Sequence, residues 1–153
     1  MRYRPRSVRR GATLVEGAVV LLAFLIFVFG LLDLSLALLR TNLLSEASRR
    51  GARQAIIHGQ MAPTGWNGGP WGPTTINVSA NTSGIPIVDE IQPLLVGMDL
   101  SKTTIKVEWI DGGNAVGQRV RATISGSYQP MITFIFGKPS IPLSASSTMP
   151  IAH

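Results

Sequence analysis

The longest apolar run of the chain lies near its N-terminal end and predicts a helix that spans a membrane. From Gly17 to Leu39 the sequence has 23 residues with a single ionisable side chain, Asp33. At 1.5 Å per residue, such a helix covers roughly 35 Å, which exceeds the roughly 30 Å of a hydrocarbon core. A cleaved secretory signal is the alternative, but its apolar region is shorter, at about 7–15 residues. We therefore predict a single-pass anchor in the lipid bilayer.

The helix is expected to continue past this run, because residues rich in helix propensity extend to a stop at His58 and Gly59. In this extension, Ala47, Gly51 and Ala55 form a packing ridge of small residues at a spacing of four. Glycine costs a helix roughly 1 kcal/mol relative to alanine, so close packing against another element would explain it. That element is either the protein's own domain or another subunit.

The rest of the sequence predicts a small α+β domain. Residues 60–83 have the composition of a loop, and Ser83–Val96 can form a short helix with one apolar face. The period then changes to two, which predicts an antiparallel sheet of about three strands. The predicted strands are Thr104–Ile110, Arg119–Tyr128 and Ile141–Met149, the last burying Ile141, Leu143, Ala145 and Met149.

The predicted fold class is therefore α+β, with a long N-terminal transmembrane helix that extends into a small exported domain. We divide the chain into a basic cytoplasmic leader (1–11), the transmembrane helix with its exported extension (12–58) and the exported domain (59–153). The helical extension and Ser83–Val96 are the available covers for one face of the sheet. The apolar segment Met131–Phe136 either fills the core or forms a patch that touches a membrane or partner.

The net charge of +6 comes mainly from the leader. Because Lys and Arg beside a first span remain cytoplasmic, these charges predict a cytoplasmic N-terminus and a periplasmic or extracellular C-terminal domain. No basic stripe with interleaved aromatic residues follows, so no nucleic-acid partner is expected. The leader arginines are Arg2, Arg4, Arg6, Arg9 and Arg10.

Charged residues elsewhere predict structure rather than chemistry. Glu46 and Arg50 are spaced to pair on the helix, and Lys106 and Glu108 could meet Arg119 or Arg121 across a hairpin. The chain has no cysteine, and its two histidines, His58 and His153, have no partner at metal-ligand spacing. We expect no catalytic residue, no metal site and no cofactor.

Asp33 is the unusual residue of the anchor. A carboxylate at the centre of a bilayer costs up to about 3 kcal/mol on insertion scales. Asp33 lies toward the outer end of the apolar run. It could therefore reach the interface by snorkelling, or it could pair with a neighbouring helix in an assembly.

Residues 9–34, RRGATLVEGAVVLLAFLIFVFGLLDL, resemble a prepilin-type N-terminus, with a basic leader, Gly, four residues, Glu and an apolar helix. In that family a membrane peptidase, the prepilin peptidase, cuts after the glycine, which implies a cut between Gly11 and Ala12. Phe29–Asp33 and Asn42–Arg53 are similar to the TadE/TadG-like proteins, pseudopilins of the tight-adherence (Flp) pilus secretion system. Gly17 departs from this pattern, because Tyr or Phe often follows the glutamate in the family.

The resemblance implies a TadE-like minor pseudopilin or pilus-assembly factor in the inner (cytoplasmic) membrane, with other pseudopilins or pilus-assembly proteins as partners. It also implies that Glu16 pairs with the free amine of a neighbouring subunit, an attraction that is stronger at low dielectric. The residues alone allow a local alternative, in which Thr13 and Glu16 form a capping box. An uncleaved, anchored binding module of the cell envelope is the alternative function. A pseudopilin of the general secretion type is a narrower variant.

Overall fold

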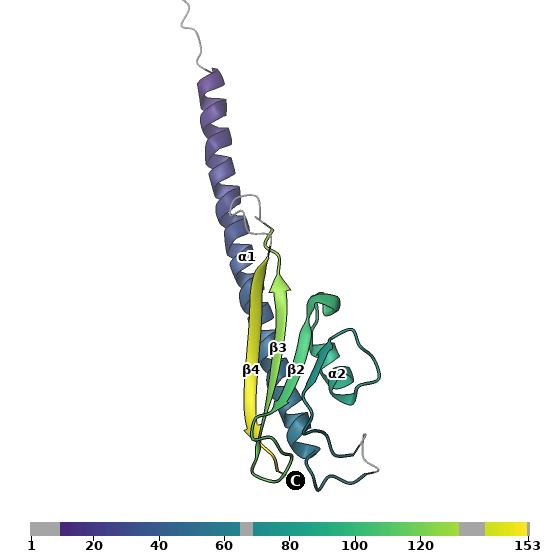
Figure 1. Cartoon of the computed structure of the whole chain (residues 1–153). Coiled ribbons are helices and arrows are strands. Elements are labelled where there is room, and N and C mark those ends of the chain that lie inside the picture. The colour runs from purple at the N-terminus through teal and green to yellow at the C-terminus, as the bar shows by residue number, and fades with distance from the viewer. Residues whose placement is uncertain (1–9, 65–68, 132–139, 153) are drawn as a thin grey trace, which may run out of the picture.

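A computed structural model of the chain describes residues 10–64, 69–131 and 140–152, and its longest element is helix α1. This helix runs over Arg10–Ile57, 48 residues, and is roughly 72 Å long at 1.5 Å per residue. Its N-terminal half projects beyond the domain, and its C-terminal half lies along the sheet (Figure 1). The helix is long and apolar enough to cross a membrane, and nearly all of its most apolar stretch is exposed. That exposure is typical of a lipid-facing anchor and not of a core helix.

The domain contains a four-stranded antiparallel sheet in the order β1-β2-β3-β4. The predicted combination of a long helix, a short helix and an antiparallel sheet is confirmed. The additional strand is β1, which lies inside the segment predicted as loop and pairs with β2. The strands are β1 (Ile76–Ser79), β2 (Thr104–Trp109), β3 (Arg119–Tyr128) and β4 (Ile141–Pro150).

Two helices cover one face of this sheet and form the core with it. Helix α2 (Pro86–Ile91) is followed by a 3-10 turn, Gln92–Leu94, and is shorter than predicted. Pro93 explains the early end, because proline has no N–H to continue the α-helical ladder. The core includes Leu44, Ala47, Ala52 and Ala55 of α1, Ile87, Val88 and Ile91 of α2, and Ile105, Val107, Trp109, Val120, Ala122 and Ile124 of the strands.

The charged side chains pair differently from the sequence-based prediction. Arg50 of α1 donates to Glu90 of α2 at 2.8 Å, so its predicted pairing with Glu46 is wrong. Lys106 and Glu108 bond to each other at 2.7 Å along β2. Glu108 lies opposite Arg121 in the register, as predicted, but Arg121 donates to Thr148 of β4 at 3.3 Å. Tertiary packing decided the first pair, since α2 brings a carboxylate to the outward face of α1.

Arg119, which was predicted to pair across the hairpin, is held by Asp111 in the turn after β2. Asp111 accepts from the backbone N–H of Arg119 at 2.8 Å and from its guanidinium at 2.7 Å. This contact holds the end of the hairpin. Because the Arg119 guanidinium is bound to Asp111, it does not form the predicted pair with Glu108 of β2.

Strand β4 is an edge strand, and it lies partly over α1. Leu143, Ala145 and Met149 are half-buried against the core, as alternation predicted. Ile141 is 41% exposed, so its predicted burial is wrong. It lies where β4 begins, at the rim of the sheet. Met131, at the start of the apolar segment, is exposed, and residues 132–136 lie outside the described part of the chain.

Candidate functional site

The junction between anchor and domain centres on Asp33, the one acid within the apolar run. Its side chain is 8% exposed, because the end of β3 covers it. The Tyr128 hydroxyl donates to Asp33 Oδ1 at 2.6 Å. The backbone N–H of Met131 donates to the same oxygen at 2.8 Å. Within the chain, the carboxylate is therefore bound by the protein's own domain.

Tyr128 connects this carboxylate to the first basic residue after the anchor. The Arg40 guanidinium lies over the Tyr128 ring, 4.7 Å from its centroid. Such a cation–π contact holds the arginine beside the sheet. Burial, together with the hydrogen bond to Asp33, raises the pKa of Tyr128 to about 12. The hydroxyl therefore remains a donor throughout the physiological range.

The position of this junction shows how the domain meets the anchor. The apolar run ends at Leu39, yet the sheet already contacts α1 at Asp33. Leu34 and Leu38 remain exposed on α1 in this overlap. An apolar cleft of about 240 Å³ is lined by Leu34 together with Gly30, Asp33, Tyr128 and Ile141. The tip of the sheet thus lies next to the last two turns of the apolar run.

We expect the Tyr128 hydroxyl to titrate near pH 12 in the folded protein. The sequence has two tyrosines, so a Tyr3→Phe variant leaves Tyr128 as the sole phenol. Its folded pKa lies above the ordinary value of about 10, so the stability it contributes is present below pH 10 and is lost as the pH rises toward 12. Ultraviolet absorbance of the phenolate measures this titration. A midpoint near 10 without denaturant would contradict the burial of Tyr128 beside Asp33.

The predicted packing ridge lies at the centre of the domain. Ala47, Gly51 and Ala55 are all buried. A Cβ added at Gly51 would lie 2.8 Å from Ile91 Cδ1 and 3.4 Å from Ala122 Cβ. The ridge therefore contacts α2 and β3 of the same chain, the first of the two partners that the sequence allowed.

The other predicted site residues lie at the opposite end of α1. Gly11, Ala12 and Glu16 are exposed, and Glu16 is roughly 25 Å from Asp33 along the helix axis. The two acids that the sequence analysis linked to assembly therefore lie far apart on the helix. Because α1 already begins at Arg10, Thr13 lies inside the helix, and a capping box at Thr13 is wrong for the uncut chain.

Groupings typical of a metal site do not occur in the part of the chain that the structure describes, where no three His, Cys, Asp or Glu side chains converge. His58 is buried at the end of α1 and stacks on Trp71, with ring centroids 3.8 Å apart. Its Nδ1 lies 2.8 Å from the Gln54 carbonyl oxygen. His58 therefore packs the end of α1 against Trp71 of the segment that follows the helix.

Comparison with known protein families finds a match that lies within α1. The family model described as TadE-like protein matches residues 11–53. This segment of the chain is TadE-like. The matched residues include the part of α1 that projects beyond the domain, and also Asp33 and Arg40. They include Ala47 and Gly51 of the ridge, and the match ends before the sheet. Neither a curated protein nor a solved structure matches the chain.

The TadE-like segment and the sheet contribute different halves of the junction. Asp33 and Arg40 belong to the matched helix, whereas Tyr128 and Met131 belong to the domain. Sequence reasoning singled out Asp33 but missed its donors. The sequence pattern could show only that Tyr128 points inward from its strand, as a large apolar residue would. It could not show that the hydroxyl is a hydrogen-bond donor to Asp33.

Proposed function

We propose that this TadE-like protein is a minor pseudopilin or pilus-assembly factor of a tight-adherence (Flp) pilus system. The observation that carries the proposal is the location of the family match on the exposed helix. Residues 11–53 include the whole apolar run Gly17–Leu39, and most of the large side chains of that run are exposed. Such a surface is suited to lipid and to other membrane helices.

In this proposal the N-terminus lies in the cytoplasm of the cell and the domain lies across the inner membrane. Prepilin peptidase cuts after Gly11, and the new amine belongs to Ala12. Gly11 is exposed in the first turn of α1. Glycine weakens a helix by roughly 1 kcal/mol, which favours the local opening that a peptidase requires.

Glu16 then serves assembly through the lipid-exposed half of α1. It lines a shallow surface groove with Thr13, Gly17, Val20, Leu21 and Phe24. A Cβ at Gly17 would have no neighbouring atom within 4 Å, so this position is open to a second helix. A carboxylate here would attract the amine of a neighbouring subunit strongly in a medium of low dielectric.

The mass of the N-terminal peptide tests the processing step. The full chain with a C-terminal tag would be produced in membranes with and without a prepilin peptidase. A chain that begins at Ala12 only when the peptidase is present is the expected result. An uncut chain beginning at Met1 in both membranes would reject processing and favour an anchored binding module of the cell envelope.

Replacing Glu16 by alanine tests the assembly step. We expect incorporation into the pilus-assembly complex to fall at least tenfold while membrane insertion persists, as measured by co-purification from cross-linked membranes. Glu46→Ala is the matched control, because Glu46 is an exposed acid of the same helix beyond the apolar run. Equal incorporation of both variants and the unchanged chain would remove Glu16 from the assembly mechanism.

A further inference from the structure

A small polar cleft opens beside the junction, on the side of Arg40. Its volume is about 230 Å³. Arg40 of α1 forms one wall, and the segment that precedes β2 forms the other. The cleft is lined by Arg40, Gly97, Asp99, Lys102, Ser127 and Gln129.

With Gly17–Leu39 as the membrane span, the cleft is placed where the hydrocarbon core gives way to the headgroups. Arg40 directly follows the apolar run Gly17–Leu39, and the hydrogen bond from Tyr128 to Asp33 holds the sheet beside this part of α1. Exposed apolar side chains adjoin the cleft in sequence: Val96, 73% exposed, precedes Gly97, and Met131, 60% exposed, follows Gln129 by two residues. Apolar side chains on both flanking segments are therefore exposed.

The donors of the cleft suit a phosphate group. Arg40 presents a guanidinium that the Tyr128 ring holds in place, and Lys102 presents an ammonium. The Ser127 hydroxyl and Gln129 amide add neutral donors. Arginine and lysine are the residues that bind phosphate oxygens most strongly.

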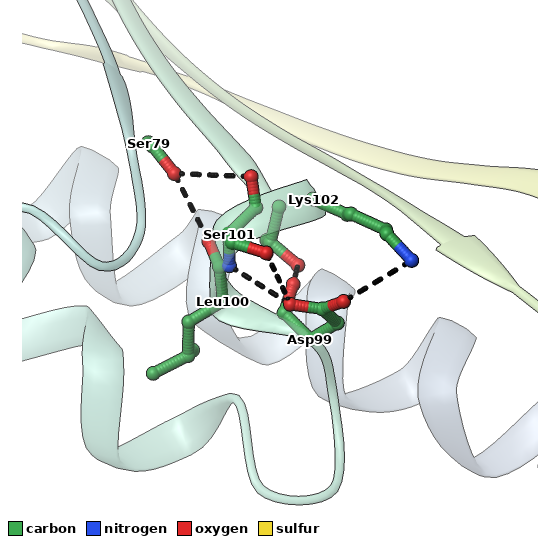
Figure 2. A network of polar contacts seen from close by, with 6 residues as sticks. Ser79, Asp99, Leu100, Ser101 and Lys102 are labelled. Carbon is green, nitrogen blue, oxygen red and sulfur yellow. Dashed lines mark hydrogen bonds and ion pairs between the residues drawn. The ribbon is translucent and has the colours of Figure 1, made fainter.

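The acid in the cleft is already engaged. Asp99 Oδ1 accepts from the Ser101 N–H at 3.1 Å and from the Ser101 hydroxyl at 2.6 Å. Lys102 pairs with Asp99 Oδ2 at 3.4 Å (Figure 2). Ser79 of β1 donates to the Leu100 carbonyl at 3.0 Å and ties this turn to the sheet. With two cations and one acid, the cleft retains a positive charge.

We propose that this cleft binds the phosphate of an anionic lipid headgroup from the leaflet on the domain's side of the membrane. The spanning helix keeps the cleft beside that leaflet, which favours a lipid over a phosphate ion in solution. The bound lipid would fix the height and tilt of the domain above the membrane.

Native mass spectrometry of the full chain, released from mixed bilayers of phosphatidylglycerol and phosphatidylcholine, tests this site. We expect phosphatidylglycerol to be retained preferentially. Lys102→Gln should reduce that preference about fivefold, since one basic residue near an anionic membrane surface has about that effect. Asp99→Asn should raise the preference by a similar factor, because asparagine retains an acceptor oxygen for Ser101 while the negative charge is lost.

Control variants separate the site from general charge and from folding. Lys106→Gln removes a cation that pairs with Glu108 on β2, and it should leave the preference unchanged. Displacement of the lipid by millimolar inorganic phosphate would assign the site to free phosphate instead. Equal preferences in Lys102→Gln, Asp99→Asn and the unchanged chain would overturn the proposal.

Discussion

Replacing Gly51 by leucine is expected to destabilise the domain by about 1–3 kcal/mol, the usual cost of overpacking a well-packed core. The first side-chain carbon would already lie 2.8 Å from Ile91 Cδ1 and 3.4 Å from Ala122 Cβ. The Ile91 methyl can move, but Ala122 lies on a central strand and cannot. The remaining carbons of leucine therefore have no space unless α1 separates from the sheet.

Tryptophan fluorescence during urea unfolding in detergent micelles measures this loss. All three tryptophans, Trp66, Trp71 and Trp109, lie beyond α1, so the signal reports on the domain and not on the anchor. The midpoint should fall in Gly51→Leu and remain nearly unchanged in Gly51→Ala. In the alanine variant, the gain in helix propensity of roughly 1 kcal/mol offsets a small shift of Ile91.

Gly17→Leu is the matched control, because position 17 lies on the same helix in open space. It should leave the unfolding midpoint of the domain unchanged. If Gly51→Leu also left the midpoint unchanged, the ridge would not pack against α2 and β3. The ridge would then be free for another subunit.

The second large effect is expected from Tyr128→Phe. This change removes the hydroxyl that donates to Asp33 at 2.6 Å and leaves a buried carboxylate short of a donor. An unsatisfied buried polar group costs about 1–3 kcal/mol, and more when it is charged. We expect faster hydrogen exchange in the helix around Asp33 and Arg40, with little change around the ridge, as measured by mass spectrometry.

A double variant distinguishes the hydrogen bond from simple packing. Asp33→Leu alone leaves the Tyr128 hydroxyl and the Met131 N–H without this acceptor. Combined with Tyr128→Phe, it replaces both side-chain partners by apolar groups, which is often nearly neutral. The double variant should therefore be more stable than the sum of the two single losses predicts. Strict additivity would mean that the two side chains do not interact.

Much of the architecture was readable because local patterns were strong. The apolar run of the anchor and the period-two alternation of β2, β3 and β4 both exceed the length at which periodicity is informative. β1 was missed, because its four residues, Ile76–Ser79, are too few to establish a period and follow a Gly- and Pro-rich stretch. It became a strand because β2 offered a free edge.

The candidate site was only half predictable for a similar reason. Asp33 is conspicuous in the sequence, since an acid in an apolar run requires compensation. Its partner Tyr128 is 95 residues away, and no local pattern connects the two. Arg50 shows the same limit, because Glu90 on α2 displaced the local partner that helical spacing suggested.

The sequence by itself determined the anchor, the succession of elements apart from β1, and the faces that β2 and β3 bury, because these depend on hydrophobic periodicity along the chain. The tertiary structure alone decided that Gly51 faces Ile91 and Ala122, that the sheet reaches α1 at Asp33, and that Arg40 and Lys102 line one cleft. The physical reason is that these contacts depend on how far the sheet extends along α1. The ridge and Asp33 are both visible in the sequence, but their partners Ile91, Ala122 and Tyr128 lie far away along the chain, so no local pattern shows which residues they contact.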